Sequence, residues 1–146
     1  MNNIKKYQTF ISGLISEDLQ KNPNFQIPKI KEGSEFSLTD GKRLRPIIVL
    51  SICNCLNKLT GQNLDSTGGA LAIEYIHNAS LIIDDMPMMD NDQYRRGKLT
   101  VHAKYGQCLA QLVAYNLIIV AMRHLGDNIQ KLNQLPFLSI LPAYKS

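Results

Sequence analysis

The feature that most constrains the fold is a long apolar segment that ends at two adjacent aspartates. Its apolar side chains, which include Leu71, Ile76 and Ile82, fall on almost every face of a helix. A helix of this kind is typical of the interior of a helical bundle, where neighbouring helices cover it. Asp65 or Ser66 can cap its N-terminus. The segment therefore predicts a buried helix that runs up to the aspartates inside an all-α fold.

Helical periodicity predicts three more helices, and no segment of useful length alternates in the manner of a β-strand. These helices are expected at about residues 4–21, 44–58 and 101–125, the last one starting at either Val101 or Gly106. Pro46 falls in the first turn of the second of them, where its missing N–H is harmless. Residues 22–42 show weak periodicity and contain two prolines and two glycines, so they are predicted to form an ordered loop. The length of 146 residues fits one domain with one core.

Charge and composition narrow the class of partner. The net charge of +4 and the pI near 9.0 favour an anionic partner. No basic run with interleaved aromatic residues supports nucleic-acid binding, so small anions are favoured and no nucleic-acid partner is expected. The longest uninterrupted apolar run, Leu117–Met122, is too short to span a bilayer, and the N-terminus lacks the pattern of a secretory signal. Three cysteines without CxxC spacing indicate thiols in a reducing compartment. A soluble, cytoplasmic protein without a membrane span is expected.

An acidic segment followed by two arginines points to chemistry, and it contains Asp84, Asp85, Asp90, Asp92, Arg95 and Arg96. Carboxylate clusters hold hard divalent cations, and Mg²⁺ is commonly shared with substrate phosphates. Guanidinium groups grip phosphate oxygens through paired hydrogen bonds. Backbone curling after Asp85 is expected to bring Asp90 round to face Asp84, so that both carboxylates reach one metal. A solvated acidic loop would explain the aspartates alone, but the adjacent arginines favour a diphosphate bound through Mg²⁺.

A second basic element, GKRLRP at residues 41–46, precedes a predicted helix whose free N–H groups favour an anion. Taken alone, its cations Lys42, Arg43 and Arg45 fit a basic surface patch better than a site. His77 lies seven residues before Asp84, about two helical turns, and therefore roughly on the same face. This histidine is either a satisfied core residue or a member of the site.

The order of the motifs, GKRLRP, then EYIHNASLIIDD, then MPMMDNDQYRRGKLTVH, resembles the trans-isoprenyl diphosphate synthases, which make geranyl, farnesyl and geranylgeranyl diphosphates. The resemblance is continuous from about Gly41 to Leu117. Two aspartates, four residues and a third aspartate, followed by RRG, resemble the first aspartate-rich motif of that family in its longer form. The resemblance implies an isoprenoid-synthase helical bundle. It also implies a Mg²⁺-dependent prenyltransferase that condenses isopentenyl diphosphate with an allylic diphosphate.

The same resemblance implies a role for each motif residue. The catalytic residues and Mg²⁺ ligands, which would grip the allylic diphosphate and draw off pyrophosphate, are Asp84, Asp85 and Asp90. Arg95 would contact that diphosphate directly. The isopentenyl diphosphate ligands would be Lys42, Arg45, His77 and Arg96. The small residues Ala79 and Ser80 would line the wall near the growing product. Farnesyl and geranylgeranyl products are both compatible with that wall, and the second is preferred.

Several features depart from the family pattern. Family members are about twice as long, and their second aspartate-rich motif has no counterpart after Gly97, where Asp127 is the only acid. Ile83, Gln107 and the pair Ala114-Tyr115 replace residues that are common in relatives. The segment of about residues 126–146 no longer resembles the family. The chain is therefore expected to be the N-terminal portion, residues 1–146, of a prenyl synthase domain with a divergent tail.

Three functions remain in competition. The chain is a prenyl synthase by descent that is incomplete as a lone catalyst, or it is a non-catalytic subunit that binds a full-length prenyl synthase. The third possibility is a stand-alone diphosphate-binding or hydrolysing domain. A homodimer, or association with another prenyl synthase chain, is expected because the apolar segment before Asp84 would otherwise expose an apolar face.

Overall fold

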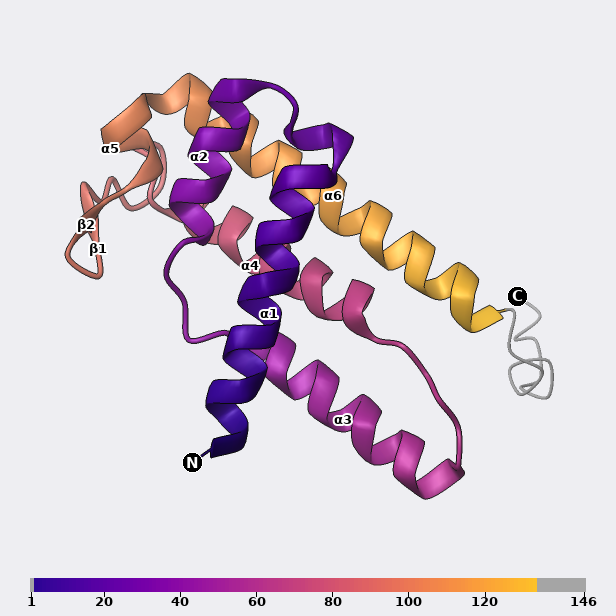
Figure 1. Cartoon of the computed structure of the whole chain (residues 1–146). Coiled ribbons are helices and arrows are strands. Elements are labelled where there is room, and N and C mark those ends of the chain that lie inside the picture. The colour runs from indigo at the N-terminus through magenta and orange to yellow at the C-terminus, as the bar shows by residue number, and fades with distance from the viewer. Residues whose placement is uncertain (1, 134–146) are drawn as a thin grey trace, which may run out of the picture.

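The computed structural model describes residues 2–133 and is built almost entirely from helices (Figure 1). The all-α prediction is therefore confirmed. In chain order the elements are α1 (Asn2–Lys21), the 3-10 helix η1 (Pro23–Phe25), α2 (Pro28–Leu38), α3 (Leu44–Thr60), α4 (Thr67–Asp84), β1 (Tyr94–Arg95), β2 (Lys98–Leu99), α5 (Val101–Tyr105) and α6 (Gln107–Asn133).

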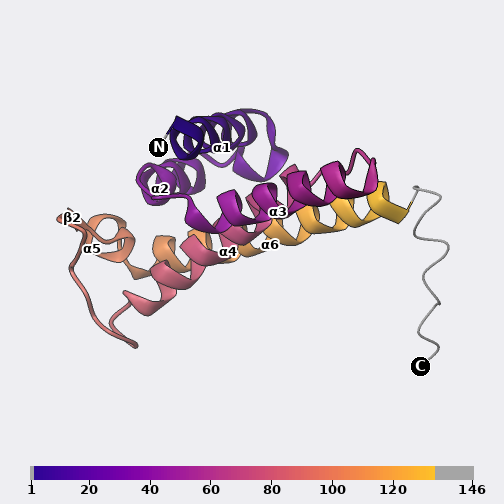
Figure 2. The ribbon, with the colours of Figure 1, turned by 90° about the horizontal axis from the view of Figure 1, so that it is seen from below.

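The helices form two layers, with α1 and α2 on one side of α3, α4 and α6 (Figure 2). The most extensive packing joins α4 to α6, and α3 packs against α4 while α2 packs mainly against α6. The core at this junction is formed by small and branched side chains, which include Ala79 on α4 and Val113 and Leu117 on α6. Helix α4 thus crosses the middle of the fold and ends at the acidic segment.

Two glycines allow the helices to approach closely. A Cβ added to Gly68 of α4 would lie 2.7 Å from the backbone oxygen of His124 in α6. A Cβ on Gly33 of α2 would lie 2.7 Å from Cγ2 of Val113. Distances this short would force the helices apart, so the absence of a side chain sets the spacing of α2 and α4 against α6.

A buried polar network ties three helices together. Asp18 of α1 accepts a 2.8 Å hydrogen bond from the hydroxyl of Tyr75 in α4, and its carboxylate lies 2.9 Å from Nε2 of His124 in α6. Asn22 donates to the other carboxylate oxygen at 3.0 Å. Partial burial opposes ionisation of Asp18, but the hydrogen bonds from His124, Asn22 and Tyr75 prevail and lower its pKa.

The predicted loop at residues 22–42 is wrong, because this segment contains η1 and α2. Pro23 and Pro28 each stand in the first turn of a helix, where a missing N–H costs nothing, so the two prolines start helices instead of excluding them. The buried face of α2 includes Gly33 and Ser34. Those small residues carry no apolar signal, and the helical period was therefore hidden in the sequence.

The last predicted helix is in fact two helices. Gly106, with φ of 86°, separates α5 from α6, and α6 continues to Asn133, past the end expected at Leu125. Only Gly adopts such a φ readily, which explains the break. The predicted boundary at residue 126 falls inside α6, and residues 134–146 lie outside the described residues. The division of the chain into a domain portion and a tail stays a prediction.

The other helix boundaries agree with the sequence analysis. Pro46 is the third residue of α3, within the first turn as predicted. At the start of α4 the carboxylate of Asp65 accepts hydrogen bonds from the N–H of Thr67 at 2.9 Å and from its hydroxyl at 2.7 Å. Ser66 occupies the cap position without a side-chain bond. Asp65 is therefore the residue that satisfies the free end of α4.

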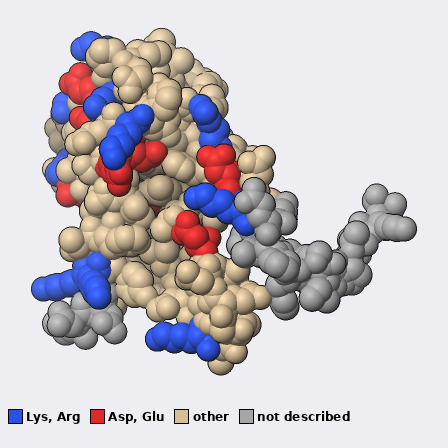
Figure 3. All heavy atoms as spheres, turned by 45° about the vertical axis from the view of Figure 1, so that its right-hand side comes forward, with Lys and Arg blue, Asp and Glu red and all other residues tan. Residues whose placement is uncertain are grey.

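The fold leaves an apolar stripe exposed along α3, formed by Ile48, Ile52, Leu56 and Leu59. On α4, Ile73 and Ile76 are more than a third exposed, so this helix leaves part of its apolar surface uncovered, as expected for the chain alone. On the face shown in Figure 3, wide areas between the charged side chains carry no charge. Apolar stripes of this kind are characteristic of surfaces that pack against further protein.

Helix α6 is long and apolar enough, by length and composition alone, to cross a membrane. The core helix of a soluble bundle meets the same criterion, and α6 buries Val113, Leu117 and Val120 completely. The absence of a membrane span therefore stays a prediction.

Candidate functional site

The chain folds back on itself after α4. The backbone N–H of Asp90 donates to the carbonyl of Asp84 at 2.9 Å, and the N–H of Asp92 donates to the carbonyl of Asp85 at 3.1 Å. Met86 is buried beneath this turn and anchors it. The predicted curling, which returns Asp90 to the level of Asp84, is confirmed for the backbone.

The carboxylates themselves do not form a closed cage. Within residues 2–133 no group of three or more acidic, histidine or cysteine side chains is close enough to hold a metal ion. Asp85 is buried and turned toward Arg95, whereas Asp84 is half-buried and Asp90 is exposed. Asp84 and Asp90 form no ion pair within that described range. Their oxygens suit a hard cation such as Mg²⁺, so the donor chemistry fits the predicted metal.

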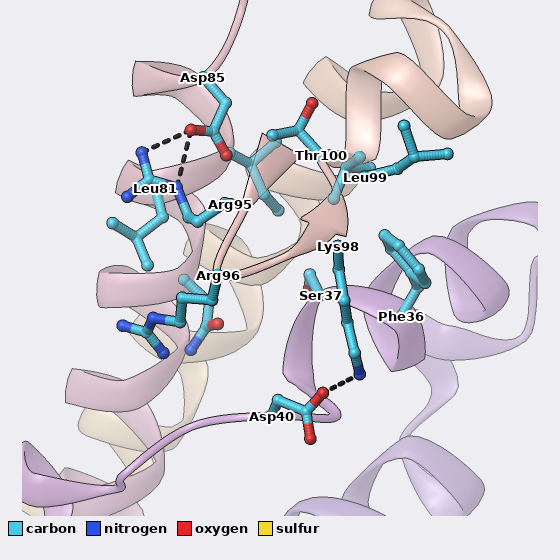
Figure 4. Close-up of a pocket in the computed structure, with 13 residues that line it drawn as sticks. Phe36, Ser37, Asp40, Leu81, Asp85, Arg95, Arg96, Lys98, Leu99 and Thr100 are labelled. Carbon is cyan, nitrogen blue, oxygen red and sulfur yellow. Dashed lines mark hydrogen bonds and ion pairs between the residues drawn. The ribbon is translucent and has the colours of Figure 1, made fainter. Parts of the chain in front are cut away.

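A short hairpin carries the two arginines. In β1 and β2, Tyr94 pairs with Leu99 and Arg95 with Lys98. The turn between them places Arg96 at φ 54° and Gly97 at φ 80°. Positive φ at both central residues is the geometry of the tight turn that matches strand twist. The turn separates the two side chains: in Figure 4 Arg95 runs to Asp85, whereas Arg96 lies farther from Asp85 and makes no drawn contact.

Arg95 and Lys98 fasten the hairpin to the helices. Arg95 donates from Nε at 2.7 Å and from Nη2 at 2.5 Å to one oxygen of Asp85. These hydrogen bonds to Asp85 raise the pKa of Arg95 against the effect of burial, and the charges of Asp92 and Asp84 add to the rise. Lys98 pairs with Asp40 in the loop after α2 (Figure 4). Each strand of the hairpin is therefore held by one ion pair.

A cavity of about 100 Å³, here called the basic pocket, opens between the loop before α3 and one face of α4. Its lining contains all four of the predicted isopentenyl diphosphate ligands, which come from three separate segments: Lys42, Arg45, His77 and Arg96. Arg43, Glu74 and Asp40 also line the cavity, but each is engaged in an ion pair. Lys42, Arg45 and Arg96 remain to make it a site for an anion such as a diphosphate. Their roles as ligands stay predictions.

His77 is a neutral member of this pocket. Its Nε2 lies 3.1 Å from Nη1 of Arg45. Burial lowers the pKa of His77, and the positive charges of Arg45 and Arg96 lower it further. Since a guanidinium can only donate, Nε2 of His77 accepts, and the ring carries its proton on Nδ1. His77 thus faces the basic pocket and Arg45, not the metal site.

The sequence analysis missed a buried ion pair beside the basic pocket. Arg43 Nη1 lies 2.6 Å from Glu74 Oε1, and both side chains are 4% exposed. A second donor of Arg43, Nη2, bonds to the carbonyl of Leu38. Arg43, the middle one of the three cations of GKRLRP, is therefore buried and neutralised by Glu74 at the wall of the basic pocket. The signal that could have revealed the pair is a single glutamate, Glu74, within an otherwise apolar helix.

A second cavity of about 240 Å³, here called the hairpin pocket, lies beside the first and is shown in Figure 4. It shares residues from the α2–α3 loop, from α4 and from the hairpin with the basic pocket, namely Asp40, Asn78, Leu81 and Arg96. Its far end reaches the Asp85–Arg95 pair, and its walls include Phe36 and Leu99. The basic pocket and the hairpin pocket are therefore neighbours with shared walls, and the hairpin pocket reaches the acidic turn at Asp85.

One prediction about the product wall is wrong. Ala79 is completely buried in the core between α4 and α6, so it cannot face a growing chain. Ser80 is exposed, and its hydroxyl bonds to the carbonyl of His77 at 2.9 Å. Of the two small residues, only Ser80 is exposed, and its role in a product wall stays a prediction.

The chain was compared with known proteins. The sequence model described as "Polyprenyl synthetase" matches residues 28–141, which include both the basic and the acidic motif. The chain is 43% identical over 98 residues to the heterodimeric geranylgeranyl pyrophosphate synthase large subunit 2 of Arabidopsis thaliana, covering 66% of this chain and 25% of that protein. It is 40% identical over 111 residues to the farnesyl diphosphate synthase of Micrococcus luteus, covering 75% and 37%.

A solved structure shows the same arrangement of helices. The geranyltransferase of Legionella pneumophila superposes with a TM-score of 0.80 at 30% identity, covering 92% of this chain and 46% of that one. The chain thus spans between a quarter and just under half of the length of these relatives.

Proposed function

Because this chain belongs to the polyprenyl synthetase family, we propose that it carries the isopentenyl diphosphate pocket and the first metal-holding turn of a prenyltransferase. The observation that carries the proposal is the meeting of Lys42, Arg45, His77 and Arg96 around one small cavity. These four residues were selected from sequence motifs up to 54 positions apart, and a chance patch would not gather them.

The basic pocket would bind the diphosphate of isopentenyl diphosphate. Arg45 and Arg96 offer planar donors that pair with two phosphate oxygens, and Lys42 offers a point charge. Neutral His77 holds Arg45 through its Nε2 and keeps a proton on Nδ1. The group held here is not the leaving group, so this pocket orients the attacking double bond and takes no part in bond cleavage.

The acidic turn would hold the allylic diphosphate. Asp84, Asp85 and Asp90 are the carboxylates that would bind Mg²⁺, which when bound neutralises the diphosphate and eases its departure. Arg95 would release Asp85 and bind one oxygen of the allylic diphosphate in its place. The apolar walls of the hairpin pocket exclude water near the reacting carbons, which is what an allylic cation requires.

Substrates, product length and the cytoplasmic location belong to the same proposal. The two substrates would be isopentenyl diphosphate and an allylic diphosphate, and the product farnesyl or geranylgeranyl diphosphate, with the second preferred. A second acidic motif must complete the catalyst, because the leaving diphosphate needs neutralisation from both sides of the cavity. A preparation of these 146 residues alone is therefore expected to condense the two substrates at a negligible rate.

The exposed apolar stripe on α3 favours a second candidate function, that of a subunit which binds another prenyl synthase chain or a second copy of itself. Ile48, Ile52, Leu56 and Leu59 present a contiguous apolar surface that water does not stabilise. Replacement of Ile52 and Leu56 by serine should then reduce self-association, measured by sedimentation velocity, without changing helical content.

Isothermal titration calorimetry with isopentenyl diphosphate is the direct test of the proposed function. Saturable binding that is lost on replacing Arg45 and Arg96 together would support it. Binding that is absent, or that is indifferent to both changes, would contradict the proposal. Prenyltransferase assays of the lone chain, free of any full-length synthase, then separate a complete catalyst from a binding portion.

A further inference from the structure

The three cations in the loop before α3 and in the first turn of α3 point in different directions, and the sequence of this segment alone does not explain why. Three cations follow Gly41 within four positions, yet only Lys42 and Arg45 are exposed at the basic pocket, whereas Arg43 is 5% exposed. Arg43 adopts φ of 52°, a left-handed conformation that a residue with a Cβ avoids. A contact from outside the loop must hold Arg43 in its buried position, and that position leaves Lys42 and Arg45 exposed.

Glu74 supplies that restraint from the middle of α4. Its Oε1 accepts a 2.6 Å bond from Nη1 of Arg43, and the carbonyl of Leu38 accepts from Nη2. Buried charges are tolerated only when paired and hydrogen-bonded, so Glu74 fixes the place of the Arg43 guanidinium. The loop lies directly over it, since a Cβ on Gly41 would come within 3.0 Å of Nη1.

The far side of the loop is held as well. Gln8 of α1 donates to the backbone carbonyl of Lys42 at 3.0 Å. Arg45 is the second residue of α3, and it reaches His77, which lies about one turn after Glu74 on α4. The pair Glu74–Arg43 and the contact Arg45–His77 are therefore two successive contacts between α4 and the start of α3.

We infer that Glu74 is a positioning residue, which acts through its buried ion pair with Arg43 to aim Lys42 and Arg45 into the basic pocket. This inference rests on the proposed function, because it explains how the anion-binding groups of that pocket are arranged. Glu74 is an acid in an anion pocket, which would be unfavourable if its role were electrostatic. The charge of Glu74 is neutralised by Arg43, and its contribution to anion binding is to position Lys42 and Arg45.

The variant Glu74→Gln separates geometry from charge. It removes one negative charge from the basic pocket, so a purely electrostatic effect would tighten anion binding. Loss of positioning would instead weaken anion binding. Without the charge of Glu74, Arg43 is an unpaired buried cation and moves out of its buried position. Calorimetry with inorganic pyrophosphate should show affinity weakened by about tenfold, the effect of one misplaced hydrogen bond to a charged group.

The pKa of His77 reports the position of Arg45 without any ligand. The groups that act on His77 by charge are Arg45, Arg96 and Arg95, which lower its pKa, and Glu74, which raises it. Deleting the charge of Glu74 would by itself lower that pKa further. If Arg45 swings away, the pKa of His77 instead rises toward its ordinary value, as followed by proton NMR.

Two further variants guard against a trivial loss of folding. Arg43→Lys keeps the charge but cannot reach both Glu74 and the carbonyl of Leu38, so it should shift both readouts in the same direction as Glu74→Gln. Asp18→Asn removes a half-buried, hydrogen-bonded carboxylate that bonds to Tyr75 of α4, and it controls for general destabilisation. It should leave the pKa of His77 and pyrophosphate affinity unchanged.

A raised pKa of His77 together with weakened pyrophosphate binding in Glu74→Gln and Arg43→Lys would support the inference. An unchanged or lowered pKa, or equal or tighter pyrophosphate binding, would overturn it. Failure of the wild-type chain to bind isopentenyl diphosphate would count against the proposed function alone. In that case the titration of His77 still decides the role of Glu74.

Discussion

Arg95 donates two hydrogen bonds, at 2.7 Å and 2.5 Å, to a single carboxylate oxygen of Asp85. The pair joins the end of α4 to the β1–β2 hairpin and closes one end of the hairpin pocket. Asp85 is a proposed Mg²⁺ ligand, and Arg95 is a proposed ligand of the diphosphate that the same metal would hold. Arg95 therefore competes with Mg²⁺ for Asp85, and Asp85 competes with the diphosphate for Arg95. Binding of the metal and the diphosphate together has to loosen the pair.

This competition predicts an unusual effect of Arg95→Gln on metal binding. Mg²⁺ should bind the wild-type chain weakly alone and more tightly with pyrophosphate, which completes the coordination shell. In Arg95→Gln, binding of Mg²⁺ alone should become tighter, because Asp85 loses its competing cation. The gain contributed by pyrophosphate should become smaller, since a phosphate contact is lost. Calorimetry with and without pyrophosphate measures both quantities.

Arg96→Gln is the matched control, because Arg96 forms no ion pair in the described part of the chain. Its affinity for Mg²⁺ alone should equal that of the wild type. If pyrophosphate binding by the wild-type chain did not depend on Mg²⁺ at all, the acidic turn would have no place in the site.

The basic pocket predicts a graded response to loss of each cation. Arg45→Ala and Arg96→Ala should each weaken isopentenyl diphosphate binding by about 1.5–3 kcal/mol, the scale of a charge-assisted hydrogen bond. Lys42→Ala should cost less, because a flexible ammonium acts as a point charge. The measurement is the dissociation constant from calorimetry. Equal, negligible losses in all three variants would reduce the pocket to a basic surface patch.

The close approach of α4 and α6 predicts opposite effects for two glycine substitutions. Gly68→Ala should destabilise the fold by about 1–3 kcal/mol, because the new Cβ meets the backbone of His124. Gly126→Ala, on the exposed side of α6 with nothing within 4 Å, should stabilise it by about 1 kcal/mol through helix propensity. Urea denaturation followed by circular dichroism tests the pair, and a stabilising Gly68→Ala would refute the helix spacing described above.

The network around Asp18 predicts a dependence of stability on pH. The pKa of Asp18 is lowered in the folded chain, so its ionisation stabilises the fold above the unfolded value of about 3.9. That contribution is lost as pH falls through the lowered pKa. Asp18→Asn should lower the free energy of unfolding by about 1–3 kcal/mol at pH 7. The loss should be much smaller at a pH below the lowered pKa of Asp18, where the wild-type carboxyl is protonated. Unfolding free energies across the range check this, and a loss independent of pH would assign the effect to packing.

Much of the fold could be predicted from residue patterns. Helices α1, α3 and α4 have apolar residues at helical spacing, and Pro46 and Asp65 mark two of their beginnings as expected. Helix α2 escaped because Gly33 and Ser34 occupy its buried face. A buried position filled by a small residue leaves no hydrophobic period to find, although the packing partner, Val113, makes the helix necessary.

The sequence by itself determined which residue types are available for chemistry, since GKRLRP, His77, the aspartates and RRG carry the charges and ligand atoms of a diphosphate site. Only the tertiary structure decided where each of those charges points. Arg43 is turned inward by Glu74, Arg95 is held by Asp85, and Arg45 reaches His77. The physical reason is that the direction of a side chain depends on partners that lie up to 32 positions away, which local spacing does not specify.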